Sequence, residues 1–203
     1  IKAALHYVAI NVATSLVFLI GAATVYGVTG TLNMADLVIR IPAASADDLS
    51  ILQSGMGILG IAFLVKAGMY PLGFWLPRTY AAAAPPVAAL FTILSKVGIY
   101  ALLRVYLLLF GINAGQASFG AEWLLYGGMA TLGFGMIGVL AARTLTGIAG
   151  YSLIVSAGTL LAAIGAGRGD VLAGALFYLV SSTLGLSAFY LLIEMIDRRE
   201  TAP

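Results

Sequence analysis

Residues 66–104 read KAGMYPLGFWLPRTYAAAAPPVAALFTILSKVGIYALLR, and this stretch decides the fold class because it sets two lysines within apolar runs of membrane-spanning length. Lys66 follows a long apolar run, and Lys96 lies near the middle of the next one. A charge at the bilayer centre costs roughly 2.5–3.5 kcal/mol on insertion scales, so such residues are rare and usually belong to ion or proton pathways. We therefore expect both lysines to be functional.

The composition indicates an integral membrane protein. Hydrophobic residues make up 62% of the 203 residues and charged residues 9%, whereas soluble domains carry about 25% charged residues. The absence of cysteine excludes disulfides and thiolate metal sites, and a single histidine argues against a histidine metal cluster. We expect no metal, no cofactor and no catalytic redox site. The net charge of +2 is too small to indicate a nucleic-acid partner.

Six apolar runs are long enough to cross a membrane, which predicts an all-α polytopic fold. They cover residues 5–28, 51–72, 86–110, 124–142, 145–166 and 171–196. Long unbroken runs disfavour a β-barrel, whose strands alternate in polarity, and we expect a loop over residues 29–50. Because the chain starts without methionine and ends soon after a span, we expect residues 1–203 to be one transmembrane domain, an internal fragment of a longer membrane protein.

Pro71 and Gly73 predict a break in the second span, near residues 67–73. Proline removes a backbone donor and clashes with the preceding turn. Broken helices inside membranes line cavities and bind ions with their freed backbone groups. Lys66 beside such a break is well placed to meet water, and the alternative is that it snorkels to the interface.

Lys96 begins a polar stripe in the third span. It lies about 15 Å along the axis from Pro86, too far from either interface to snorkel comfortably. Thr92, Tyr100 and Arg104 occur at intervals of four around it, which places them along one slowly drifting face. We expect this stripe to face the bundle interior or a wet cavity, with Lys96, Tyr100 and Arg104 on a proton pathway. Arg104 is also suited to anchor the helix at the outer interface.

The two lysines have no obvious counter-charge. Burial disfavours the charged form of an ammonium group, so a lysine inside a membrane can bind and release protons near neutral pH. No aspartate or glutamate occurs at mid-depth in the six spans. We expect water, backbone carbonyls or sequence beyond this chain to stabilise Lys66, and we favour the last.

Hydroxyl and aromatic side chains give weaker signals. Hydroxyls in the last two spans could relay protons, although bonding a carbonyl of their own helix is the conservative interpretation; they are Tyr151, Ser152, Ser156, Thr159, Tyr178, Ser181, Ser182 and Thr183. Four aromatic residues near span ends fit an aromatic belt, namely Trp75, Tyr80, Trp123 and Tyr126. The glycine-rich run 127–142 predicts close helix packing.

Basic residues gather on one side of the predicted spans. Lys2, Arg78, Arg143, Arg198 and Arg199 share the side of the N-terminus, and Arg40 and Arg168 lie opposite. The positive-inside rule therefore predicts a multi-pass protein of the cell (inner) membrane with both ends in the cytoplasm.

Two blocks resemble the proton-conducting antiporter-like membrane subunits, namely residues 66–104 and YGVTGTLNMADL at residues 26–37. The resemblance extends more loosely over all 203 residues. This family includes membrane-arm subunits of respiratory complex I and large subunits of Mrp-type (Pha-type) cation/proton antiporters. The wording PLGFWLPRTYAAAAPPVAALF is most similar to the D-type members of the Mrp/Pha group, because complex I subunits more often carry an acidic residue and a histidine after WLP.

The resemblance implies about fourteen helices in two inverted repeats, each with a broken helix. It also implies that Lys66 is the lysine of the broken helix, paired with a glutamate upstream of this chain, and that Lys96 is the next lysine of a central polar axis. Family members often have a histidine where Ser181 stands. Because serine holds no proton at neutral pH, we expect a water-mediated step or a different route there.

We therefore expect proton translocation as one component of a multisubunit Na⁺(K⁺)/H⁺ antiporter, with other subunits, lipid, protons and monovalent cations as partners. A second hypothesis is a proton-pumping subunit of an NADH-quinone oxidoreductase or a related hydrogenase. A third is a non-transporting scaffold in a membrane assembly.

Overall fold

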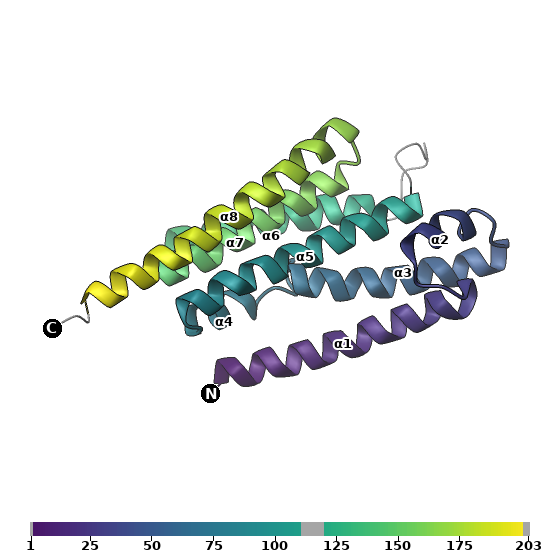
Figure 1. The fold of residues 1–203 in the computed structure, drawn as a ribbon. Coiled ribbons are helices and arrows are strands. Elements are labelled where there is room, and N and C mark those ends of the chain that lie inside the picture. Colours follow the sequence, from purple (N-terminus) through teal and green to yellow (C-terminus); the bar gives the residue numbers. More distant parts are fainter. Residues whose placement is uncertain (1, 111–119, 201–203) are drawn as a thin grey trace.

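The computed structural model describes residues 2–110 and 120–200, which form eight helices and no strand (Figure 1). Six of these helices contain a stretch long and apolar enough to cross a membrane. They are α1 (Lys2–Thr29), α3 (Ala46–Ala67), α5 (Pro85–Phe110), α6 (Ala121–Ala141), α7 (Leu145–Gly165) and α8 (Gly169–Glu200). The expected all-α fold with six candidate spans is confirmed.

The long helices lie side by side in alternating directions. α1 packs along α3, α3 along α5, and α5 against α8, while α6 and α7 form a pair that meets α8. An even number of crossings returns the chain to the side where it started, and Figure 1 shows the start of α1 and the end of α8 at the same end of the bundle.

The α6–α7 pair is packed at backbone contact. A Cβ atom on Gly128 would lie 2.4 Å from the backbone nitrogen of Ala162, and one on Gly158 would lie 2.4 Å from that of Leu132. Small residues let helices approach this closely inside membranes, where packing drives their association. The expectation of close packing at residues 127–142 is thus confirmed.

The predicted break is present between α3 and a short helix, α4 (Leu76–Ala82). Gly68 ends α3 in the left-handed conformation, with φ of 79°, which glycine adopts without strain. Residues 68–75 are non-helical and contain Pro71. Gly73 lies directly against this cap, because a Cβ at that position would be 2.0 Å from the carbonyl oxygen of Gly68. The break therefore requires glycine at both positions.

The break is attached to the rest of the bundle on two sides. The backbone N–H of Tyr70 donates to the hydroxyl of Thr131 in α6 over 2.9 Å, and Thr131 is fully buried. α4 then packs against α7 and α1. Contacts on both sides fix where α3 stops and where the next segment begins.

Two of the expected boundaries are wrong. The second span ends at Ala67 rather than at residue 72, because Gly68 caps it. Residues 29–50 are not a plain loop, because they contain α2 (Met34–Arg40) and the first turn of α3. The reason is capping, which span counting ignores. The side chain of Asn33 accepts from the Ala35 N–H over 2.9 Å, and that of Ser45 accepts from the Asp48 N–H over 3.2 Å.

The prediction of an aromatic belt is wrong for two of its four residues and stays a prediction for the other two. Trp123 and Tyr126 are 76% and 65% exposed. Trp75 and Tyr80 are 5% and 3% exposed, because α4 folds back between α1 and α7 and carries them inward. These two side chains belong to the interior, next to Lys66.

Candidate functional site

Lys66 lies in the last turn of α3, and its ammonium group contacts a neighbouring helix. Its Nζ donates to Oδ1 of Asn11 in α1 over 2.5 Å, and the lysine is half-buried. The last carbonyls of a helix lack intrahelical donors and form the negative end of its dipole. Lys66 is thus positioned where a carboxamide oxygen and a helix C-terminus both stabilise a positive charge.

Asn11 is a site residue that sequence reasoning missed. Its Nδ2 donates to the carbonyl of Tyr7 over 2.8 Å, which leaves the amide oxygen to face Lys66. The signal was available, since Asn11 is the one amide side chain in the apolar run 5–28. Amides in membranes commonly hydrogen-bond across helices.

Lys96 is buried in the middle of α5. It is 2% exposed, and its Nζ donates to the hydroxyl of Ser156 in α7, which is 3% exposed. Thr92, one turn earlier, is fully buried and bonds the carbonyl of Ala88. Within residues 2–110 and 120–200, no carboxylate forms an ion pair with either lysine.

The structure does not bring the remaining predicted site residues to the lysines. Tyr100 is 45% exposed and Arg104 is exposed, so the expectation of an interior stripe is wrong for its outer half. A row of residues spaced by four drifts about 40° per step, hence about 120° from Thr92 to Arg104. Ser181 is exposed and bonds the carbonyl of Tyr178 over 3.2 Å. A proton-pathway role for these three side chains remains a prediction.

The partner of Lys96 opens onto a large cavity. Its volume is about 710 Å³, and residues of α6, α7 and α8 line it. Its hydroxyl groups are those of Ser152, Ser156, Tyr178 and Ser182, and its remaining walls are mostly apolar. Ser156 alone therefore connects a buried ammonium group with a space wide enough for several waters.

Most other hydroxyls in the last two spans satisfy their own helices. Thr159 bonds the carbonyl of Val155, and Ser182 and Thr183 bond that of Leu179. This confirms the conservative interpretation for those residues. Ser156 is the exception, because it contacts a charged group on another helix.

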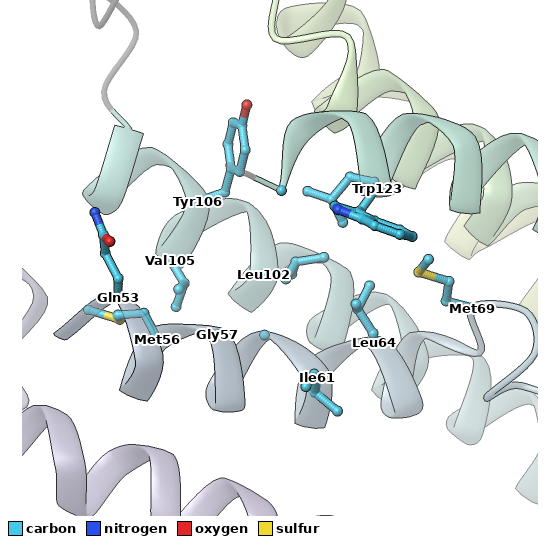
Figure 2. A pocket seen from close by; sticks show the side chains of 13 residues that line it. Gln53, Met56, Gly57, Ile61, Leu64, Met69, Leu102, Val105, Tyr106 and Trp123 are labelled. Carbon is cyan, nitrogen blue, oxygen red and sulfur yellow. The ribbon is translucent and has the colours of Figure 1, made fainter. Parts of the chain in front are cut away.

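A second cavity, between α3, α5 and α6, is almost wholly apolar. Figure 2 shows its lining, with Gln53 at one side of the view and Trp123 and Met69 toward the other. Its volume is about 170 Å³, and neither lysine lines it. We assign it no part in the chemistry of the site.

A bundle of apolar helices with one broken helix and two interior lysines defines a polytopic membrane protein with a charged axis. The family follows from the sequence comparison. The chain belongs to the NADH:quinone oxidoreductase/Mrp antiporter transmembrane family, whose model matches residues 1–202. The resemblance stated for the two sequence blocks is thereby confirmed.

Two curated relatives are components of cation/proton antiporters. The chain is 57% identical over 203 residues to the probable K⁺/H⁺ antiporter D subunit of Rhizobium meliloti (strain 1021), covering all of this chain and 38% of the relative. It is 34% identical over 199 residues to the Na⁺/H⁺ antiporter D subunit of Alkalihalophilus pseudofirmus, covering 98% of this chain and 39% of the relative. The chain thus spans less than two fifths of these relatives.

Two solved structures have the same fold. A chain of the Mrp complex from Dietzia sp. DQ12-45-1b matches with a TM-score of 0.85 at 27% identity, covering 96% of this chain and 35% of that one. A chain of the membrane-bound sulfane sulfur reductase, an archaeal respiratory membrane complex, matches with a TM-score of 0.83 at 25% identity, covering 96% and 39%. The chain is thus similar to one component of a larger complex.

Proposed function

We propose that the chain is part of the D subunit of a multisubunit K⁺/H⁺ or Na⁺/H⁺ antiporter and that it carries protons between Lys66 and Lys96 through water. One observation carries this proposal. Two ammonium groups on neighbouring helices are held by neutral partners, Asn11 and Ser156, next to a helix break and to a cavity. A neutral partner orients an ammonium group without fixing its proton as a carboxylate does.

The partner of Lys96 suits both protonation states. A serine hydroxyl both donates and accepts. It accepts from the ammonium form of Lys96, and after deprotonation it can turn and donate to the amine nitrogen. The contact between α5 and α7 therefore persists while the proton moves, and the cavity beyond Ser156 supplies water to exchange with.

The same proposal includes the setting of the chain. It forms a transmembrane domain of a longer protein in the cell (inner) membrane, with lipid, other subunits, protons and monovalent cations as its partners. Both ends face the cytoplasm. Support comes from α4 and the connection between α6 and α7, which carry the basic residues Arg78 and Arg143. They lie at the same end of the bundle as the start of α1 and the end of α8 (Figure 1).

The test measures cation-driven proton flux in vesicles containing the full complex. Lys66→Ala and Lys96→Ala are each expected to lower the flux roughly 100-fold or more, as for other positioned proton carriers. Arg168→Ala is a matched control for a lost cation, because Arg168 forms a surface ion pair with Asp170. Full flux in both lysine variants would contradict the proposal.

A second function is favoured by the similarity to the respiratory complex of archaea. In this case the chain would pump protons in an assembly whose electron carriers lie in other subunits. The same vesicles separate the two functions. Proton flux driven by a Na⁺ or K⁺ gradient alone supports the antiporter, and flux that requires an electron donor supports the redox complex. Lysine variants that impair assembly but leave flux per complex unchanged would instead indicate a scaffold.

A further inference from the structure

A small cavity lies beside Lys66, between α1, the break, α4 and α5. Its volume is about 40 Å³, and its lining residues with polar groups are Tyr7, Asn11, Lys66, Trp75, Tyr80 and Ser95. A cavity needs roughly 10–15 Å³ of such volume to hold one water molecule, and that water needs two to four polar partners. The space accepts water and excludes a hydrated cation.

One lining residue needs a partner that the protein does not provide. Trp75 is 5% exposed, and its indole N–H is buried with no hydrogen-bond acceptor among the described residues. A buried donor left unpaired costs about 1–3 kcal/mol. Water in the adjoining cavity is the simplest acceptor for this group, and Lys66 and Asn11 line the same cavity.

The opposite wall carries two hydroxyls that share one carbonyl. Oη of Tyr80 lies 2.6 Å from Oγ of Ser95 and 2.9 Å from the carbonyl oxygen of Phe91. Ser95 lies 3.3 Å from the same carbonyl oxygen. Two arrangements are therefore possible: either Tyr80 donates to Phe91 and Ser95 to Tyr80, or Ser95 donates to Phe91 and Tyr80 to Ser95. A proton relay needs such a reversible pair.

The position of Ser95 links the two lysines. Successive residues of a helix point about 100° apart. Ser95 faces α4 and the small cavity, and Lys96 faces α7 and Ser156. The hydroxyl pair thus lies at the small cavity, and Ser95 directly precedes Lys96 in the chain.

We propose that this cavity is a water-binding site and that the hydroxyl pair of Tyr80 and Ser95 passes protons between its water and Lys96. The inference rests on the proposed function and names the route that serves it. One N–H bond of the Lys66 ammonium breaks as an O–H bond forms on the water, and the water gives a different proton to the pair. The pair releases its own hydrogen toward the neutral amine of Lys96, so every group on the way returns to its neutral form.

The test uses the full complex in vesicles and removes single atoms. Tyr80→Phe deletes only the hydroxyl and keeps the ring, which packs against Phe91 with centroids 5.6 Å apart. Ser95→Ala deletes the other hydroxyl, and Ser95→Thr retains one. Two control variants remove a tyrosine hydroxyl and a serine hydroxyl at positions away from the cavity. Tyr126→Phe changes an exposed residue of α6, and Ser54→Ala changes a serine that bonds a carbonyl of its own helix.

Tyr80→Phe and Ser95→Ala are each expected to lower cation-driven proton flux roughly tenfold or more. The double variant should be no slower than the slower single variant, because both hydroxyls serve one step. Ser95→Thr should keep the flux near the wild-type rate, because threonine retains the hydroxyl. Both controls should keep the wild-type rate.

Two results would overturn the relay. If Lys66→Ala abolishes flux but Tyr80→Phe and Ser95→Ala do not, the relay is wrong and the proposed function stands. If Lys66→Ala and Lys96→Ala both keep full flux as well, the proposed function fails and the relay fails with it. An experimental map of the whole complex gives a readout independent of transport. Water density at 2.7–3.2 Å from Trp75 Nε1 or Tyr80 Oη supports the site, and a side chain filling the cavity refutes it.

Discussion

Lys66 and Lys96 each place an ammonium group inside the helix bundle, but different contacts stabilise the two charges. Lys66 stands at the end of a broken helix, half-buried, against the carboxamide of Asn11. Lys96 stands in an unbroken helix, 2% exposed, against the hydroxyl of Ser156. The first lysine has a helix terminus and a strong neutral acceptor to stabilise its charge. The second has one hydroxyl, so the surroundings of Lys96 supply fewer groups that favour a cation.

The two lysine sites also differ in whether backbone or side-chain features form them. The site of Lys66 depends on backbone features, namely the cap at Gly68, the close contact of Gly73 and the tether to Thr131. The site of Lys96 depends on side chains alone. Substitutions that disturb the backbone should therefore affect Lys66 more than Lys96. Replacing each lysine by an apolar residue should lower the stability of the complex at Lys66 but not at Lys96.

The largest effect is expected from Gly73→Ala. The added methyl group would meet the carbonyl of Gly68 at 2.0 Å, and neither backbone can yield without moving the break. We expect a loss of about 3 kcal/mol, the upper range for overpacking, and little assembled complex. Gly57→Ala in the preceding helix is the control, because its methyl group meets nothing within 4 Å. The yield and melting temperature of the purified complex are measured for both variants. Equal values for Gly73→Ala and Gly57→Ala would contradict the tight packing of the break.

The next effect compares Lys66→Met with Lys96→Met. Loss of Lys66 leaves the oxygen of Asn11 without its donor, which should destabilise the complex by about 1–3 kcal/mol. Loss of Lys96 removes a poorly compensated buried charge, and Ser156 can turn to a carbonyl of its own helix. The second variant should therefore be neutral or more stable. The melting temperatures of the two purified complexes test this prediction. A larger drop in melting temperature for Lys96→Met than for Lys66→Met would contradict it.

A smaller effect on transport is expected from Asn11→Asp. The new carboxylate would form an ion pair with Lys66 and hold its proton, so proton flux should fall roughly tenfold, as opposite charges at contact favour the charged forms. Asn33→Asp makes the same chemical change at the N-cap of α2, where aspartate caps as well as asparagine, and should leave flux unchanged. Wild-type flux in Asn11→Asp would show that a neutral partner is unnecessary.

The smallest effect is expected from Thr131→Val, which removes the acceptor of the Tyr70 N–H while keeping the shape of the side chain. The expected loss is about 1 kcal/mol of stability, with Lys96 unaffected. Thr159→Val is the control, because that hydroxyl bonds a carbonyl of its own helix. Unfolding in denaturant compares the stabilities of the two variants. Identical midpoints would show that the hydrogen bond from Tyr70 to Thr131 does not stabilise the break.

Much of the fold could be predicted from the sequence. Apolar run length gives the six spans, and Pro71 with Gly73 gives the break, because both signals are local. The short helix α2 was missed because its caps at Asn33 and Ile41 lie outside any apolar run.

The partners of the two lysines could not be predicted in the same way. Periodicity places Lys96 on a face of α5 but does not say which helix covers that face. Ser156 was one of eight candidate hydroxyls, and its contact with Lys96 depends on how α5 meets α7. Tyr100 and Arg104 share the spacing of Lys96 yet lie outside, because a straight helix turns its fourth residues steadily away. The partners of a site residue depend on contacts between helices, and the sequence pattern of a single helix does not reveal those contacts.

The backbone contact of α6 with α7 also decides where probes can be attached. A spin label or fluorophore between these helices would force them apart, since even a methyl group at Gly128 has no space. The outer surfaces of α6 and α8 accept large substituents, with Leu140 on α6 87% exposed and Phe177 on α8 77% exposed. Leu140 lines the 710 Å³ cavity, and Phe177 lies on another helix that lines it. The distance between them therefore offers a spectroscopic ruler for whether that cavity widens during turnover.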